Sequence, residues 1–167
     1  AYYYMTSPWD VVADRWYHLA IQRYNLPSSI SLFIDGVYQI LTVDTAIASS
    51  SLADLSAVIT IGRRTPNNDL YFNGWIDEFR FSTGGNQYNA ARHGYGSFNP
   101  NPFAYGDTGG STGNDYLSIA DSASWVFGTG DFTIDFWVKK VSVYDGPGGT
   151  IIQQYDDASN YWRIWLN

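Results

Sequence analysis

The sequence contains no cysteine, which excludes disulfide bonds and thiolate metal sites from this chain of 167 residues. Glu78 is the only glutamate, and Lys139 and Lys140 are the only lysines. A chain poor in these residues and rich in Gly, Asp, Ser and Asn forms strands and turns more readily than helices. No apolar run reaches the roughly 18 residues of a membrane-spanning helix, so we expect no membrane insertion.

Basic clusters are also missing. The formal net charge is -7, and the only adjacent basic pairs are Arg63-Arg64 and Lys139-Lys140. Because phosphate contacts need clustered Lys and Arg, nucleic acid is not an expected partner. The acidic balance is compatible with solubility or with cation binding at Asp clusters, and it decides neither. No signal peptide is visible, and residues 1–5 resemble the middle of a strand, which predicts a processed or truncated start.

Aromatic and apolar residues are abundant. Hydrophobic residues make up 45% of the chain, enough for a sizeable core. Aromatic residues favour strands, and they also favour surfaces that face sugars or proteins. Apolar residues alternate in short runs, without a sustained helical period. About a dozen short strands are therefore expected, which predicts an all-β, two-sheet antiparallel sandwich.

The segment Gly74–Ser82 predicts a central strand. Phe79 and Phe81 lie on one face of a regular strand, whereas Ile76 falls out of phase with them. We predict a bulge near Asp77-Glu78 that returns Ile76 to the core.

Two further segments predict connections. Asp35-Gly36 lies between two apolar runs and predicts a tight hairpin. Residues 83–114 lose all periodicity and consist mainly of Gly, Asn, Pro, Ser and Tyr, so we expect a linker that packs along the surface. The expected anchors are Tyr88, Tyr95, Phe98, Phe103 and Tyr105.

Four segments carry a resemblance to a known family. They read RWYHLAI from Arg15, LFIDG from Leu32, ITIGR from Ile59 and GWIDEFRFS from Gly74. In this order they resemble the closing half of a laminin-G-like (concanavalin-A-like) jelly-roll domain. Many secreted eukaryotic domains of this kind carry a disulfide, so the missing cysteines favour a bacterial, phage or environmental-virus origin.

The end of the chain resembles the opening half of the same domain. Residues 116–119 (YLSI) and 127–138 (FGTGDFTIDFWV) are similar to its first strands, notably in phage virion and tail-associated members. Asp135 stands where Glu is commoner in those members. The two halves are therefore in swapped order.

This order divides the chain into three parts: a closing half (1–82), a linker (83–114) and an opening half (115–167). A circular permutation, a window cut from a tandem array, or completion of each sandwich by a neighbouring chain would each explain it. In all three cases residues 115–167 must pair with a segment like 1–82, because half a sandwich would expose its aromatic face and edge strands.

Catalytic residues are not expected. Glucanases of this architecture use alternating carboxylates on one strand, and retaining chemistry needs two carboxyl groups about 5 Å apart. Asp131 and Asp135 lie roughly 13 Å apart by strand rise. Asp77 and Glu78 are adjacent and face opposite ways in a regular strand. His18 lies in a strand where the resemblance implies a structural histidine.

Binding sites are predicted from residue types that border polar loops. Flat aromatic faces cover the C–H groups of sugars, and amides and carboxylates bond their hydroxyls. The candidates for carbohydrate binding are Trp9, Tyr71, Tyr155, Tyr161 and Asn160. Calcium needs about six oxygen ligands, and its candidates are Asp156, Asp157, Asn67 and Asp69. The alternatives are that the aromatic residues pack on the core or a subunit contact, and that the Asx residues form turns.

These observations predict a non-catalytic structural or adhesive subunit of an extracellular or virion assembly, such as a fibre, spike or coat. Its expected partners are other copies of the chain or adjacent repeats, and cell-surface glycans. A soluble carbohydrate-binding lectin module is the alternative, and a β-glucanase-like glycoside hydrolase is a remote one.

Overall fold

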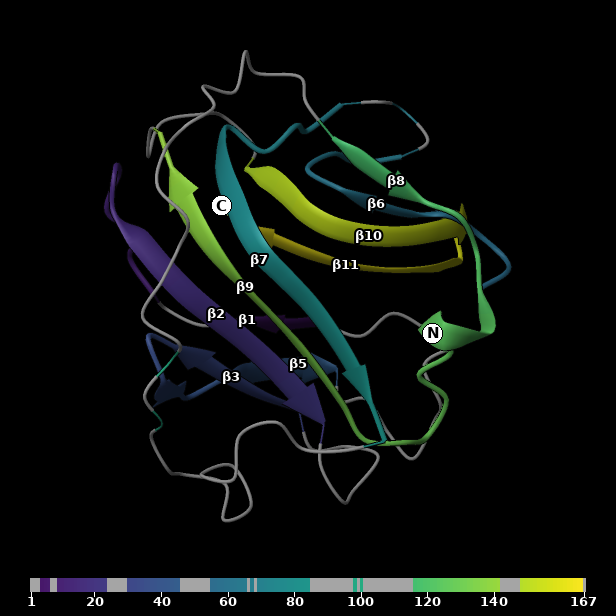
Figure 1. The fold of residues 1–167 in the computed structure, drawn as a ribbon, viewed down its shortest axis with the longest axis horizontal. Helices are drawn as coiled ribbons and strands as arrows, with labels where there is room; N and C mark the ends of the chain where they lie inside the picture. The colour runs from purple at the N-terminus through teal and green to yellow at the C-terminus, as the bar shows by residue number, and fades with distance from the viewer. Residues whose placement is uncertain are drawn as a thin grey trace.

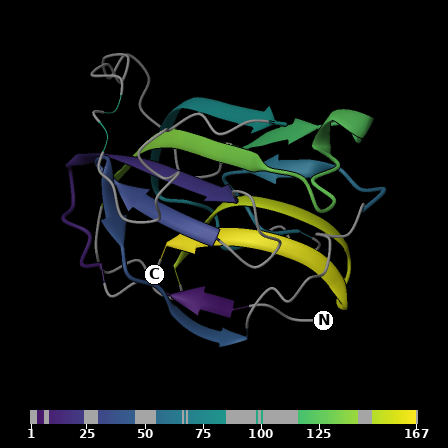
Figure 2. The same cartoon turned by 90° about the horizontal axis from the view of Figure 1, so that it is seen from below.

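The computed structural model describes residues 4–6, 9–23, 30–45, 55–65, 67, 69–84, 98, 100, 116–141 and 148–166. Within this part of the chain the regular structure is almost entirely strand, with one 3-10 turn, η2 (Ala123–Trp125). No helix among these residues has the length and apolar character needed to cross a membrane. Two antiparallel sheets face each other (Figures 1 and 2), so the predicted all-β sandwich is confirmed.

The larger sheet has five strands in the order β4-β3-β2-β9-β7. These strands are β4 (Val37–Gln39), β3 (Ile30–Ile34), β2 (Trp16–Arg23), β9 (Phe132–Lys140) and β7 (Gly74–Thr83). The smaller sheet has four strands in the order β11-β10-β6-β8. They are β11 (Asn160–Leu166), β10 (Gly149–Asp157), β6 (Ile59–Ile61) and β8 (Leu117–Ile119). A separate two-stranded sheet pairs β1 (Tyr4–Thr6) with β5 (Thr42–Thr45).

Both main sheets combine strands from the two ends of the same chain. β9 lies between β2 and β7 and pairs with both over almost its whole length. In the other sheet, β6 lies between β10 and β8. β8, β9 and β10 thus pair with strands that come before residue 84, and β11 pairs with β10. Completion by a neighbouring chain would place this pairing between two chains, whereas here it lies within one. Which explanation of the predicted order applies stays a prediction.

The core lies between the two sheets and consists of side chains from both. Leu19 and Phe136 of the larger sheet and Ile59 and Ile152 of the smaller sheet are at most 2% exposed. Burial of each such side chain is worth about 1.5–3 kcal/mol. Phe79 stacks on Phe136 with ring centroids 5.4 Å apart. Neither half of the chain could bury these faces without the other.

The predicted bulge and hairpin are both confirmed. The register of β7 against β9 shifts between Asp77 and Arg80, and Glu78 has a positive φ of 48°. Ile76 consequently packs on the core together with Phe79. At the end of β3, Asp35 and Gly36 have φ values of 49° and 76°, as a two-residue turn with both central residues left-handed requires.

Several predicted boundaries were wrong. β10 continues through Asp157, so the predicted turn at 156–160 contains only residues 158–159. The apolar run after Asp35-Gly36 is divided between β4 and β5, and Ile40 between them is exposed. Residues 11–13 and 71–72 form no strand.

Phe98 lies on the outer face of the five-stranded sheet. Its backbone N–H donates to the Gly36 carbonyl at 2.9 Å. Its ring centroid lies 5.3 Å from that of Phe33 and 5.9 Å from that of His18. The prediction that Phe98 anchors the segment 83–114 is therefore confirmed. The other predicted anchors, Tyr88, Tyr95, Phe103 and Tyr105, lie outside the described residues.

Candidate functional site

A tight hairpin joins β10 to β11 and positions two tyrosines side by side. Asp157 holds the turn, because its Oδ1 accepts hydrogen bonds from the backbone N–H groups of Ser159 (2.7 Å) and Asn160 (2.9 Å). Its Oδ2 accepts a bond from the Asn160 amide at 2.9 Å. The Ser159 bond above all holds the pKa of Asp157 below its usual range. The hairpin register places Tyr155 opposite Tyr161, with ring centroids 5.8 Å apart and planes inclined by 31°.

The alternation of β10 and β11 shows which way these tyrosines point. The next pair, Gln154 and Trp162, faces inward. The Trp162 indole N–H donates to Gln154 Oε1 at 3.0 Å, and its ring lies 5.5 Å from the core residue Phe127. Because successive side chains of a strand point to opposite faces, Tyr155 and Tyr161 lie on the outer face of the sheet. Both are partly exposed.

A loop after β6 folds back over this outer face. The Gln153 side-chain amide donates to the Thr65 carbonyl at 3.0 Å, which ties the loop to β10. Inside the loop, Arg64 Nε and Nη2 donate to the two carboxylate oxygens of Asp69 at 2.7 and 2.5 Å. These bonds lower the pKa of Asp69 and raise that of Arg64. Tyr161 contributes a weaker electrostatic effect that also raises the pKa of Arg64.

β11 continues the same outer face with a cation and a further aromatic ring. Arg163 lies opposite Gln153 in the register, two residues after Tyr161. Its guanidinium carbon lies 4.9 Å from the centroid of the Trp165 ring. This outer surface is the β10–β11 face. It consists of Arg64, Asp69, Tyr155, Tyr161, Arg163 and Trp165.

A second group of polar residues lies on the outer face of the five-stranded sheet. Asp135 of β9 is 3% exposed, and Arg80 donates to both of its carboxylate oxygens at 3.0 Å. His18 is also 3% exposed, and its Nε2 lies 3.6 Å from Asp135 Oδ1. Farther along the same face, Lys139 Nζ lies 4.2 Å from the Trp75 ring centroid and 5.4 Å from that of Trp16.

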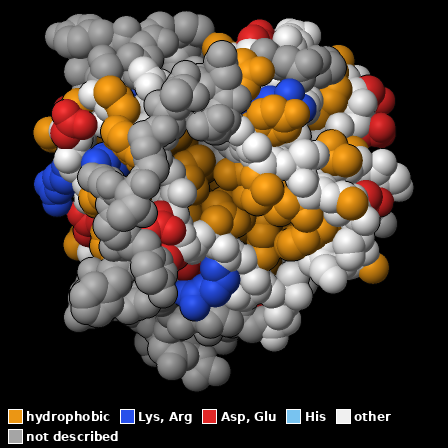
Figure 3. Space-filling view, turned by 45° about the horizontal axis from the view of Figure 1, so that its top comes forward, with side chains coloured by type: hydrophobic (Ala, Val, Ile, Leu, Met, Phe, Trp, Pro, Cys, Tyr) orange, Lys and Arg blue, Asp and Glu red, His pale blue; other side chains and the backbone are white. Residues whose placement is uncertain are grey.

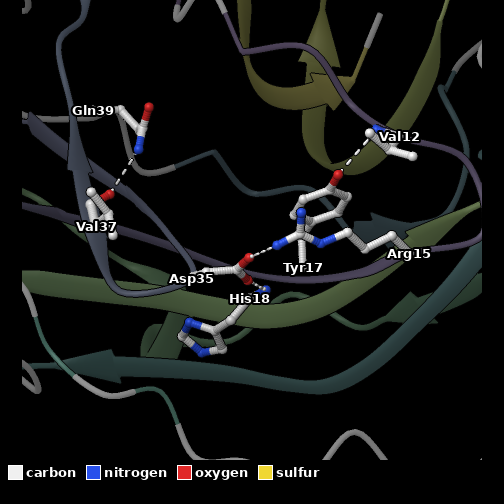
Figure 4. A network of polar contacts seen from close by, with 7 residues as sticks. All are labelled: Val12, Arg15, Tyr17, His18, Asp35, Val37 and Gln39. Carbon is white, nitrogen blue, oxygen red and sulfur yellow. Dashed lines mark hydrogen bonds and ion pairs between the residues drawn. The ribbon is translucent and has the colours of Figure 1, made fainter.

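Two carboxylates that the sequence assigns to turns and backbone bonds have these roles. Asp35 Oδ1 accepts from the His18 backbone N–H at 2.9 Å, and Asp35 Oδ2 accepts from Arg15 at 3.0 Å (Figure 4). Asp77 Oδ1 accepts from the Glu78 backbone N–H at 2.8 Å, inside the bulge. This prediction is confirmed for both residues.

The comparison with protein families gives one match. The family model described as the concanavalin A-like lectin/glucanases superfamily, Laminin_G_3, matches residues 1–84, just over half of the chain. The chain belongs to this superfamily. The match covers β1 to β7 of the concanavalin A-like sandwich, and β8 to β11 complete both of its main sheets. No curated protein and no solved structure matches the chain.

The concanavalin A-like fold brings some of the predicted sugar-binding residues together and separates the others. Tyr155, Tyr161 and Asn160 share one hairpin. The Tyr71 backbone lies beside Gly149, at the other end of β10 and about 20 Å from Tyr155 by strand rise. Trp9 packs edge-on against Tyr17 with centroids 4.7 Å apart and touches the core, which is its alternative role.

The predicted calcium ligands lie in two oxygen-rich loops. Both oxygens of Asp69 bond to Arg64, and Asn67 also bonds to this carboxylate. Both oxygens of Asp157 accept bonds within its own turn, while Asp156 is exposed. Among the described residues, no three His, Asp or Glu side chains gather in a group that could hold a metal ion. The donor set therefore fits turn formation better than a calcium cage, and calcium binding stays a prediction.

Three residues of the β10–β11 face were missed from the sequence: Arg64, Arg163 and Trp165. Arg163 and Trp165 could have been found, because alternation from Tyr161 places them on the same face of one strand. Arg64 could not, because its position depends on a loop that returns over a strand almost ninety residues later in the chain.

Proposed function

We propose that this chain is a non-catalytic, structural and adhesive β-sandwich of an extracellular or virion assembly that contacts glycans through the β10–β11 face. The observation that carries the proposal is the tyrosine pair, which lies partly exposed between an Arg–carboxylate pair and an Arg–Trp pair. Aromatic faces cover the apolar C–H groups of a sugar, and fixed polar groups beside them orient its hydroxyls.

The rigidity of this face supports binding. Backbone bonds to Asp157 fix the hairpin, and the Gln153–Thr65 bond fixes the loop on the sheet. Tyr155 and Tyr161 lie on paired strands, so little side-chain freedom is lost when a sugar binds. Asn160 at the turn and Asp69 in the loop supply polar groups on two sides of the ring pair.

The polar group around Asp135 supports a non-catalytic role. An acid catalyst in glycoside hydrolysis must reach the leaving oxygen, with a second carboxylate at a fixed separation. Asp135 is buried, and both of its oxygens are bonded to Arg80. Asp77 lies on the neighbouring strand β7, opposite Trp137 and thus two residues farther along than Asp135. Its carboxylate accepts a hydrogen bond from the backbone of its own bulge.

Apolar side chains at the sheet edges support assembly with other copies of the chain. β7 and β8 are the outermost strands of their sheets. Figure 3 shows hydrophobic side chains gathered across the side of the sandwich that this view turns forward. Leu117 of β8 is 56% exposed, and Val126 after η2 is 39% exposed. Contiguous exposed apolar surface is typical of protein–protein contacts.

A glycan array tests the binding function. We expect saturable binding by the full chain and an affinity about tenfold lower for Tyr161→Ala and for Tyr155→Ala, the equivalent of about 1.4 kcal/mol. Tyr71→Ala is the matched control. It also removes a tyrosine side chain, but from a residue that lies beside the other end of β10, so it should leave the affinity unchanged. Absence of glycan binding, or an equal loss in all three variants, would contradict the proposal.

Light scattering then separates the proposal from a soluble lectin. A structural subunit should associate through contacts of more than about 1,000 Å². Its particle mass should therefore exceed that of one chain at micromolar concentration. A chain that binds sugar and stays monomeric at all concentrations is a lectin module instead.

A further inference from the structure

Several arginines lie on or beside the four-stranded sheet of this acidic protein. They are Arg63, Arg64 and Arg163, three of the seven in the chain. Arg64 is neutralised by Asp69. Arg163 and Arg63 contact aromatic rings, and among the described residues neither forms an ion pair with a carboxylate. Arg163 is thus a cation that no carboxylate among the described residues neutralises, on a chain whose formal net charge is -7.

Arg163 is held in a geometry suited to binding an anion. Its guanidinium lies over the Trp165 ring at 4.9 Å, and such a contact restrains the planar group and replaces part of its water shell. A guanidinium presents parallel N–H donors that match the two oxygens of a carboxylate or a sulfate. The side chain is partly exposed, so the donors that do not face the ring can reach a ligand.

The spacing along β11 brings Arg163 next to the Tyr155–Tyr161 pair, which is the platform on which a sugar would stack. Tyr161 and Arg163 are two residues apart on the same face, about 7 Å by strand rise. A single sugar unit stacked on Tyr161 would therefore extend its substituents toward Arg163. At the opposite end of the platform, Asp157 and Asn160 provide oxygen and amide groups. The end of the tyrosine pair near Arg163 is therefore cationic and the end near Asp157 is anionic, so a charged sugar would bind in one orientation.

We propose that the ligand of the β10–β11 face is an acidic glycan. Its sugar ring stacks on Tyr161, and its carboxylate or sulfate accepts hydrogen bonds from Arg163. The inference rests on the proposed glycan-binding function and names the ligand class for the same surface. The net negative charge of the chain opposes the approach of any polyanion, so selectivity for an acidic glycan must come from local contacts at this site.

Calorimetric titration of the full chain with three polysaccharides tests the inference: polygalacturonate for carboxylate, dextran sulfate for sulfate, and neutral galactan. At low salt we expect at least one acidic polymer to bind about tenfold more tightly than galactan, in line with a charge-assisted bond. This preference should shrink as salt is added. The stronger of the two acidic polymers identifies the anionic group.

Two substitutions that change the net charge equally isolate the site. Arg163→Gln should abolish the preference for acidic polymers, so that galactan and the acidic polymers bind with similar affinity. Arg15→Gln, which removes an exposed arginine that pairs with Asp35, should retain the preference. Circular dichroism and the melting temperature of both variants verify that they are folded.

The outcomes separate this inference from the function on which it rests. Equal affinity for galactan and both acidic polymers, or an unchanged preference in Arg163→Gln, would overturn the acidic-glycan proposal while leaving glycan binding intact. If none of the three polymers binds and the glycan array is also negative, the binding function and this inference both fail.

Discussion

Arg80 and Asp135, 55 residues apart in the chain, form a two-bond ion pair across β7 and β9, with Nε–Oδ2 and Nη2–Oδ1 distances of 3.0 Å each. Asp135 is 3% exposed, whereas the Arg80 side chain is 50% exposed. The pair therefore joins strands from two distant parts of the chain, on the face of the sheet away from the core. Its position indicates a role in holding these two parts together.

Asp135→Asn should destabilise the protein by about 2 kcal/mol, because a buried carboxylate with two charged hydrogen bonds loses its charge while its half-exposed partner turns to solvent. Urea unfolding followed by tryptophan fluorescence measures this change. Asp121→Asn, at an exposed position, removes the same charge and should change stability by less than about 0.5 kcal/mol. Equal effects of the two substitutions would show that the ion pair contributes nothing.

The wild-type chain should not hydrolyse β-glucan, because Asp135 is buried and bonded to Arg80 and Glu78 is the only glutamate. Reducing-sugar release from barley-type mixed-linkage glucan and from cellulose oligomers measures the activity. If hydrolysis is detected and disappears in a folded Asp135→Asn variant, the non-catalytic assignment is wrong.

Arg23 should be among the most sensitive positions in the chain. It is 1% exposed, and its guanidinium donates to the carbonyls of Phe127 (3.0 Å), Gly128 (2.7 Å) and Gly130 (2.8 Å from Nε). Burial lowers its pKa, although an arginine stays charged at neutral pH. Arg23→Met should cost about 3 kcal/mol, because several buried carbonyls lose their donor.

Arg23→Lys distinguishes these hydrogen bonds from the charge alone. Lysine keeps the charge but cannot reach three carbonyls with a planar fork, so it should recover less than half of the loss. Denaturant unfolding of both variants measures the difference. Full recovery by lysine would show that charge, and not the directed hydrogen bonds, stabilises the turn after η2.

The sandwich, the β-bulge and the hairpin could be predicted from the sequence because they depend on short-range patterns. Alternation identified β2, β3 and β9, the broken phase of Ile76 predicted the bulge, and Asp35-Gly36 predicted the hairpin. Each of these features is decided within a few residues, where side-chain period and turn chemistry dominate. The family resemblance of residues 1–82 agrees with the matched range 1–84.

The composition of the candidate site could be predicted only in part. Tyr155, Tyr161 and Asn160, three of the five predicted sugar-binding residues, lie in one hairpin. Arg64 joins them through the Gln153–Thr65 bond, a contact between residues 88 positions apart. Trp9 borders a polar loop in the sequence yet packs against Tyr17. Which aromatic residue meets solvent depends on tertiary packing, and alternation does not report it.

Gly36→Ala should destabilise the protein more than the same substitution at Gly84. Both glycines have positive φ values, 76° and 74°, so an alanine at either position costs a similar amount, about 1 kcal/mol, in backbone strain. A Cβ at Gly36 would collide with the Phe98 carbonyl, whereas a Cβ at Gly84 would meet no atom within 4 Å. The additional loss of stability in Gly36→Ala, compared with Gly84→Ala, therefore measures the contact of Phe98 with the five-stranded sheet.

Thermal unfolding of the two glycine variants gives the comparison. We expect Gly36→Ala to lower the melting temperature further than Gly84→Ala and to increase amide exchange at Phe98. Phe98→Ala combined with Gly36→Ala should lose less than the sum of the single effects, because the two residues act through one contact. Strict additivity would contradict this arrangement.

The Arg64–Asp69 pair should make the loop at the β10–β11 face sensitive to acid. Hydrogen bonds from Arg64 lower the pKa of Asp69 in the folded protein. A carboxyl group with a depressed folded pKa stabilises the fold fully above its unfolded pKa of about 3.9. That contribution is lost as the pH falls through the lower folded pKa. The pair should therefore be intact at neutral pH and open in strong acid.

Carboxyl NMR titration of Asp69 measures this directly. In the wild type its midpoint should lie below that of an ordinary aspartate, and in Arg64→Gln it should move upward, because the guanidinium donors are gone. Asp69→Asn should have a lower melting temperature than the wild type at pH 7, and this difference should shrink as the pH falls through the folded pKa of Asp69. A midpoint that does not move in Arg64→Gln would mean that the two side chains are not paired in solution. The loop would then have to be held on the tyrosine platform by the Gln153–Thr65 bond and its other backbone contacts.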